Sequence, residues 1–128
     1  MNHAALITVL TMFLLLAVMI GVGRARGRYG VKAPATTGPE GFERALRVQV
    51  NTLEGALMFL PSLWLFAIYV SDVWAGIVGA VWLVGRIAYA IGYYQAAAKR
   101  SAGFLIGFIA TAILMVGSLV GVVQVLLG

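Results

Sequence analysis

Cysteine is absent from this 128-residue chain, and charged residues make up only 10% of it. Without cysteine the chain can form no disulfide, no thiolate metal site and no thiol nucleophile of its own. A soluble domain carries about 25% charged residues, so the scarcity of charge argues against a soluble globular protein. Hydrophobic residues instead make up 62% of the sequence, a composition that indicates a membrane protein.

Four long apolar stretches account for most of the chain. We expect helices at about residues 4–28, 41–70, 73–98 and 102–127. Each is long enough to cross a hydrocarbon core of about 30 Å, and the second and third connections are very short. The first stretch has no convincing cleavage site, so we interpret it as a retained helix. The pattern predicts an all-α integral membrane protein, with residues 1–128 forming one four-helix bundle and Pro61 producing a kink.

Acidic residues are few, since four Asp and Glu face nine Lys and Arg, for a formal net charge of +5. In a soluble protein this excess would suggest nucleic acid, but in a membrane protein basic residues are better interpreted as topology signals. All of them except Arg86 lie in or beside the first and third connections. We therefore expect both connections to be cytoplasmic, both termini and Asp72 to lie on the opposite side, and no nucleic-acid partner.

A polar stripe begins the second helix. Arg44, Arg47, Asn51 and Glu54 follow one another at intervals of three, four and three residues, with Gln49 on a neighbouring face. Such a stripe is costly in a membrane helix unless it meets partners. One interpretation is an ion pair of Arg44 or Arg47 with Glu54 that fixes helix register. The other is a site for a zwitterionic ligand, with Arg for carboxylates, Glu for an ammonium and Asn for a peptide group.

The third helix carries a second set of polar residues. Arg86, Tyr89, Tyr93 and Arg100 fall at helical offsets that share one face. Arg86 lies in mid-span and needs a partner, for which Glu54 is the candidate. The tyrosines could equally form an interfacial aromatic belt. Arg100 is either a topology anchor or, near the start of the fourth helix, a cation that stabilises a thiolate or another anion.

Other motifs are weak. His3 lies close to a terminus and is interpreted as incidental, while Arg24 and Arg28 are assigned to lipid headgroups or topology. No metal-ligand spacing, glycine-rich phosphate loop or Ser/His/Asp arrangement is present, so no metal is expected.

Three segments resemble a known family. FERALRVQVNTLE, from Phe42 to Glu54, is similar to the signature of the membrane-associated proteins in eicosanoid and glutathione metabolism, the MAPEG family. The preceding ATTGPEGFER resembles a loop of the leukotriene C synthase branch, and RIAYAIGYYQAAAKR, from Arg86 to Arg100, resembles its third helix. The resemblance covers about residues 26–100 without gaps, and by hydropathy the whole chain.

The resemblance implies a homotrimer that binds glutathione, as co-substrate, between neighbouring protomers near the cytoplasmic face. The positions that match glutathione-contacting residues of the family are Arg26, Arg47, Gln49, Asn51, Glu54, Tyr89 and Tyr93. Arg100 matches the arginine proposed to stabilise the glutathione thiolate. Arg86 and Arg44 match positions that are interpreted as structural.

The implied activity is that of a membrane-bound glutathione S-transferase in detoxification. It would conjugate glutathione to lipophilic electrophiles that arrive from the lipid, or reduce lipid hydroperoxides. One departure is Gly55, where the leukotriene-synthase branch has tyrosine, and Ala88 and Ile91 replace polar residues. Specificity for eicosanoids is therefore not supported. The short ends are typical of a bacterial or generalist member, so we expect a bacterial inner-membrane location.

Two other classes of protein remain as alternatives. A small four-span multidrug transporter would have a suitable length, but the first helix carries no acidic residue for coupling and Glu54 lies among arginines. A non-catalytic scaffold that kept the fold is the second alternative, against which Arg100 and both tyrosines argue. Flux and conjugation assays separate these classes.

Overall fold

The computed structural model describes all 128 residues, and four long helices make up nearly all of it. The helices are α1 (Asn2–Tyr29), α2 (Glu40–Tyr69), α3 (Asp72–Gln95) and α4 (Ser101–Leu127), with a short 3₁₀ turn, η1 (Ala97–Arg100), before α4. The expected all-α, four-helix architecture is confirmed. All four helices are long and apolar enough to cross a membrane.

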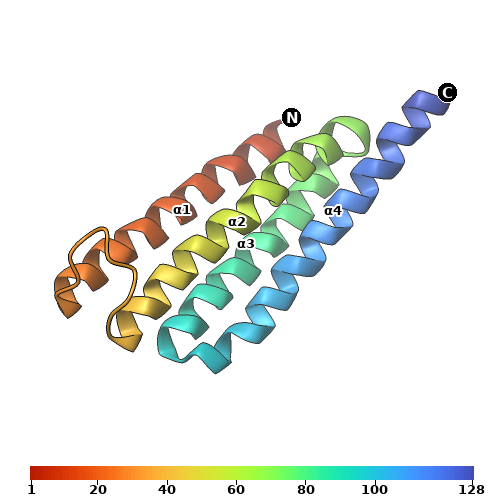
Figure 1. Ribbon diagram of the computed structural model, residues 1–128. Helices are drawn as coiled ribbons and strands as arrows, with labels where there is room; N and C mark the ends of the chain where they lie inside the picture. The colour runs from red at the N-terminus through yellow and green to blue at the C-terminus, as the bar shows by residue number, and fades with distance from the viewer.

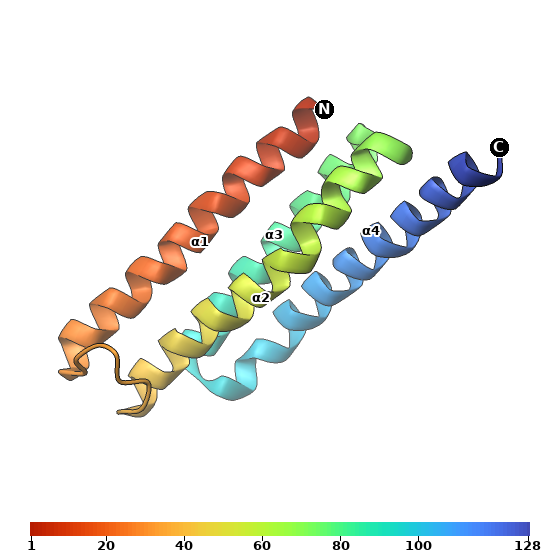
Figure 2. The same ribbon diagram turned by 45° about the horizontal axis from the view of Figure 1, so that its top comes forward.

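The helices run alternately up and down, so that both termini lie at one end of the bundle (Figure 1). The α1–α2 loop and η1 lie together at the other end, called here the loop end. Helices α2 and α3 occupy the middle, and α1 and α4 lie on opposite sides of them, as a second view shows (Figure 2). The basic connections and the polar start of α2 therefore meet at the loop end.

Local sequence explains where α1 ends and where α3 begins. Gly30 follows α1 with φ of 67°, a left-handed conformation that glycine adopts without steric cost. At the opposite end of the bundle, the side chain of Ser71 accepts a hydrogen bond from the Trp74 N–H and caps α3. Asp72 accepts hydrogen bonds from the N–H groups of His3 and Ala4, and its carboxylate lies 2.8 Å from His3 Nδ1. His3, expected to be incidental, thus joins α1 to the α2–α3 turn.

The end of α3 differs from the expectation. The helix was expected to reach residue 98, but it ends at Gln95, because Ala96 is extended with φ of −164° and the chain reverses through η1. Arg100 therefore does not continue the face of α3. It immediately precedes α4, and the short turn returns it towards the tyrosines of α3.

The core lies between the helices near mid-span. Trp82 is 1% exposed and stacks on Phe59 with ring centroids 3.9 Å apart. Pro61 lies inside α2, which continues through it to Tyr69. The carbonyl of the next residue, Ser62, accepts a hydrogen bond from Ser118 on α4. A neighbouring helix thus supports the backbone beside the proline, as membrane helices require.

Helices α3 and α4 approach each other closely at glycine. A Cβ built on Gly103 would lie 2.3 Å from the backbone nitrogen of Tyr89 and 2.7 Å from the carbonyl oxygen of Gly85. Only glycine permits this approach, which follows the small-residue packing common in membranes. The contact fixes the first turn of α4 directly against Tyr89.

The outer surface of the bundle is strongly apolar. On α1 and α4 many large hydrophobic side chains are exposed, including Phe13, Met19, Ile109 and Leu119. In water such a surface would be an aggregation hazard, but in lipid it is the expected exterior. The chain is a multi-pass integral membrane protein.

Candidate functional site

A cavity of about 790 Å³ opens near the loop end between α2, α3 and the start of α4. We call it the polar cavity. Six of the predicted site residues line it: Arg47, Asn51, Glu54, Tyr89, Tyr93 and Arg100. The size falls within the range of about 300–1,000 Å³ that small-molecule pockets occupy.

The charged residues of the polar cavity have no ion-pair partners in the chain. Arg44 pairs with Glu40, one turn earlier on α2, at 2.8 Å. The predicted ion pair of Arg44 or Arg47 with Glu54 is therefore wrong for this structure, since Arg44 is drawn towards the solvent-exposed start of the helix. Arg47 and Glu54 are both exposed and remain free to meet charges from outside the chain.

Arg86 has different neighbours from those expected. Instead of meeting Glu54, its Nη2 donates to Asn51 Oδ1 at 2.8 Å and to Thr52 Oγ1 at 3.1 Å. The guanidinium also lies over the ring of Tyr89, with Cζ 4.2 Å from the ring centroid. The predicted Arg86–Glu54 pair is wrong because the side chain reaches neutral acceptors one turn closer to the loop end.

The two tyrosines connect Arg86 to Arg100. The rings of Tyr89 and Tyr93 meet edge to face with centroids 5.5 Å apart, and Arg100 Cζ lies 5.5 Å from the centroid of Tyr93. Tyr89 is 3% exposed, so it belongs to the wall of the cavity and not to an interfacial aromatic belt. The row Arg86–Tyr89–Tyr93–Arg100 is held by cation–π and aromatic contacts.

The remaining predicted ligand-binding residues lie outside the polar cavity of their own chain. Arg26, in the last turn of α1, donates from Nη1 to the Ala35 carbonyl at 2.8 Å and lies over the ring of Phe42. It ties the α1–α2 loop to the bundle. Gln49 is half-buried on α2 and does not line the cavity.

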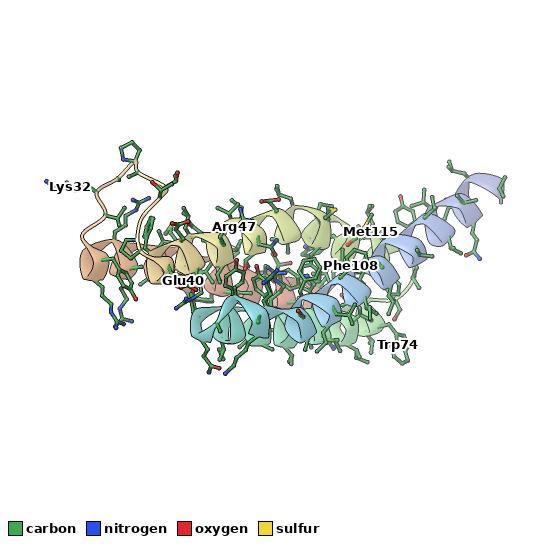
Figure 3. All side chains as sticks on the ribbon, turned by 60° about the horizontal axis from the view of Figure 1, so that its bottom comes forward. Lys32, Glu40, Arg47, Trp74, Phe108 and Met115 are labelled. Carbon is green, nitrogen blue, oxygen red and sulfur yellow. The ribbon has the colours of Figure 1, made fainter.

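A second hollow of about 520 Å³ continues from the polar cavity along α2 and α4. We call it the apolar groove. Its walls include Met58, Trp82, Phe104, Phe108, Met115 and Val116. It shares Asn51, Glu54 and Phe104 with the polar cavity, so the two are continuous. In Figure 3, Arg47 of the polar cavity lies nearer the loop end, and Phe108 and Met115 of the apolar groove lie farther along α4.

Some lining residues were not predicted from the sequence. Ser101 and Phe104, in the first turn of α4, line the polar cavity because η1 folds back on α3. Their position shortly after Arg100 in the sequence could have suggested that they line the same site. Thr52 was missed as a partner of Arg86, although a polar residue beside Asn51 in a membrane helix could have suggested it.

The sequence comparisons identify the family. The family model described as "MAPEG family" matches residues 4–120. An uncharacterized protein of Synechocystis, sll1147, is 60% identical over 118 residues, 92% of this chain and 86% of that protein. Mouse microsomal glutathione S-transferase 2 is 39% identical over 101 residues, 79% of this chain and 69% of that protein. Guinea-pig leukotriene C4 synthase is 39% identical over 98 residues, which are 77% of this chain and 65% of that protein.

Together with the four-helix fold, these matches show that the chain is a multi-pass membrane protein and that it belongs to the MAPEG family. The resemblance inferred from the signature Phe42–Glu54 is confirmed. The relatives include a bacterial protein as well as mammalian proteins named glutathione S-transferase and leukotriene C4 synthase.

Proposed function

We propose that the protein is a membrane-bound glutathione S-transferase. The observation that carries the proposal is the polar cavity, where two unpaired cations, one unpaired carboxylate, an amide and two tyrosines lie together. Glutathione has two carboxylates, one ammonium, two peptide groups and a thiol, so its charges complement this set. Relatives named microsomal glutathione S-transferase 2 support the same conclusion.

Each side chain then has a role that follows from its chemistry. Arg47 binds a carboxylate, since guanidinium and carboxylate form charge-assisted hydrogen bonds. Glu54 accepts from the γ-glutamyl ammonium, Asn51 bonds a peptide group, and Tyr89 and Tyr93 pack against the tripeptide and bond it through their hydroxyls. Arg86 and Arg44 are structural in this scheme.

Arg100 is the proposed catalytic residue. A free thiol ionises near pH 8.5, so only a few per cent of glutathione is thiolate at neutral pH. A guanidinium next to the sulfur favours the charged form, and each unit by which the thiol pKa falls corresponds to about 1.4 kcal/mol. The amide groups at the start of α4, directly after Arg100, add a favourable dipole.

The apolar groove is the proposed path of the electrophile. It joins the polar cavity at Phe104 and is walled by aromatic and aliphatic side chains, which suit a lipophilic compound from the bilayer. The thiolate attacks an electrophilic carbon, a carbon–sulfur bond forms, and the leaving group departs with its electron pair. With a lipid hydroperoxide, the thiolate attacks the terminal oxygen, an S–O bond forms as the O–O bond breaks, and the alkoxide is protonated and leaves as an alcohol. The glutathione sulfenic acid then reacts with a second glutathione to give glutathione disulfide and water.

A homotrimer would complete the site. Arg26 and Gln49 do not line the polar cavity of their own chain, and the cavity opens on the surface of the bundle. We therefore assign their glutathione contacts to a neighbouring copy. A native mass in detergent of three times the 13.6 kDa of the chain is the expected result.

The test combines binding and turnover. Isothermal titration calorimetry of the purified protein in detergent should show glutathione binding below millimolar concentration. A generic aryl halide should then be converted to its glutathione conjugate, with release of halide. Binding without conjugation would indicate a scaffold, and no binding at millimolar glutathione would contradict the proposed function.

A further inference from the structure

A buried arginine without a carboxylate partner lies beneath the polar cavity. Arg86 is 4% exposed, and no acidic side chain lies within ion-pairing distance of it. Its Nη2 donates to two neutral acceptors on α2, Asn51 Oδ1 at 2.8 Å and Thr52 Oγ1 at 3.1 Å. Neutral oxygens do not compensate the positive charge of the guanidinium. The role of Arg86 at this position therefore needs an explanation other than charge pairing.

The chemistry of the guanidinium decides how Asn51 is oriented. All of its N–H groups donate and none of its atoms accepts a hydrogen bond. The atom of Asn51 that faces Arg86 must therefore be the carbonyl oxygen, because a flipped amide would set donor against donor. The amide nitrogen, with two N–H groups, is then directed away from Arg86. Asn51 lines both the polar cavity and the apolar groove, so this nitrogen is available there.

The guanidinium itself is firmly placed. Thr52 accepts from the same Nη2, and the ring of Tyr89 lies under the guanidinium, with Cζ 4.2 Å from the ring centroid. Contacts from two helices therefore hold Arg86, and Arg86 in turn holds Asn51. This arrangement exists before any ligand arrives, so no reorientation of the amide is needed on binding.

Resting on the proposed function, we infer that Arg86 is a positioning residue that locks the Asn51 amide as a hydrogen-bond donor towards the ligand. The ligand group at this position must then be an acceptor, namely a peptide carbonyl or carboxylate oxygen of the tripeptide. A ligand that presents an amine or another N–H at this point would meet a donor and be rejected. Because Arg86 fixes the orientation of its amide, Asn51 selects ligands that present a hydrogen-bond acceptor at this point. An amide that is free to rotate could meet either a donor or an acceptor.

Asn51→Asp is the decisive substitution. The aspartate keeps an acceptor for Arg86 and neutralises the buried charge, so the folded state should be at least as stable, with Tm unchanged or raised. The cavity, however, loses its donor and gains a negative acceptor. The dissociation constant for glutathione, measured by calorimetry in detergent, should rise about tenfold or more. An unchanged constant would show that the ligand takes no hydrogen bond from the Asn51 amide nitrogen.

Substitutions of Arg86 provide the second measurement. Arg86→Met removes the lock, and glutathione affinity should fall about fivefold or more, since the amide can turn its oxygen to the ligand. Arg86→Lys, which also presents only donors, should restore part of the affinity. Arg28→Met is the matched control, because it makes the same substitution at an arginine that lies over Tyr29 and lines neither cavity. The affinity of this control variant for glutathione should stay within about threefold of that of the parent protein.

The outcomes separate this inference from the proposed function. If the parent and Asn51→Asp bind glutathione equally well, the inference is overturned while the function stands. The same holds if Asn51→Asp does not fold and Arg86→Met binds as tightly as the parent. If the parent fails to bind glutathione at all, the proposed function falls, and the ligand assigned to Asn51 falls with it.

Discussion

Unpaired charges distinguish the polar cavity at the scale of single residues. Arg47, Glu54 and Arg100 all line it, and none has an ion-pair partner within the chain. Arg100 only donates to the carbonyl of Ala97 in its own turn and lies over Tyr93. Charged side chains near a membrane interior are kept where they meet a ligand, a partner chain or water. These residues are therefore the first to substitute.

Arg100→Ala should lose the glutathione thiolate while keeping most of the affinity for glutathione. The reason is that the guanidinium favours the ionised sulfur, whereas the rest of the tripeptide is held by α2 and the tyrosines. Absorbance of the thiolate near 240 nm, measured at neutral pH on the purified protein, reports the change. Lys99→Ala is the matched control, since Lys99 reaches only Gln95 and does not line the cavity. An undiminished thiolate signal in Arg100→Ala would remove Arg100 from this role.

Glu54→Gln should weaken glutathione binding and leave the thiolate of the bound fraction intact. The amide keeps the shape of the side chain but removes the charge that attracts the γ-glutamyl ammonium, and a hydrogen bond to a charged group is worth about 1.5–3 kcal/mol. The dissociation constant should therefore rise about tenfold or more, as calorimetry can measure. Unaltered affinity would show that the ammonium binds elsewhere.

Residue spacing predicted which side chains gather in the cavity better than it predicted their partners. The intervals along α2 and α3 placed Asn51 and Tyr89 on suitable faces, and both line the cavity. The same intervals could not tell that Arg86 meets Asn51 and Thr52 and not Glu54, because that depends on the axial offset between two helices. Residue periodicity predicts which face of a helix a side chain lies on, but the axial offset between two helices is determined by how they pack.

At the scale of elements, the junction of α3 and α4 determines the shape of the site. The sequence predicted four helices, but helical periodicity gave no sign that α3 ends at Gln95 and that η1 folds back. The reversal depends on contacts between distant residues. A Cβ on Gly92 would lie 2.3 Å from the carbonyl oxygen of Lys99, so η1 rests directly on α3 there. Glycine at this contact lets Arg100 reach Tyr93.

Gly103→Ala tests the crossing of α3 and α4. Its Cβ would lie 2.3 Å from the backbone nitrogen of Tyr89, which cannot move as a flexible side chain could. We expect a loss of about 1–3 kcal/mol in the free energy of unfolding, the usual cost of overpacking. The thermal midpoint in detergent should fall accordingly. Gly23→Ala is the control, since nothing lies within 4 Å of its Cβ, and its midpoint should not fall. Equal midpoints for both variants would contradict the close crossing.

At the scale of the whole molecule, both basic connections lie at the loop end (Figure 1). The polar cavity is lined by residues near the same end. The basic residues predict that this end faces the cytoplasm, where a water-soluble co-substrate would reach the cavity directly. The apolar groove runs from there along α2 and α4, towards the middle of the bundle. This arrangement would let a water-soluble and a lipid-soluble reactant reach the same point from different phases.

The absence of cysteine makes the orientation directly measurable. Single substitutions Thr36→Cys, in the α1–α2 loop, and Val70→Cys, between α2 and α3, place one thiol at each end of the bundle; both positions are exposed. In intact bacterial cells, a membrane-impermeant maleimide should label Val70→Cys, and Thr36→Cys only after permeabilisation. The unsubstituted protein is the blank. The reverse labelling pattern would place the polar cavity on the other side of the membrane.

The stacked pair of Trp82 and Phe59 gives the protein an optical probe of its own. Trp82 is almost fully buried, yet it forms part of the wall of the apolar groove. Its indole emission depends on the polarity of its surroundings and on quenchers in contact with the ring. With Trp64 and Trp74 replaced by phenylalanine, Trp82 is the only tryptophan left. In that variant a brominated or nitrated hydrophobic compound that occupies the groove should quench this emission, whereas glutathione in the polar cavity should change it little. Arrival of the two reactants could thus be followed separately, without attaching a label.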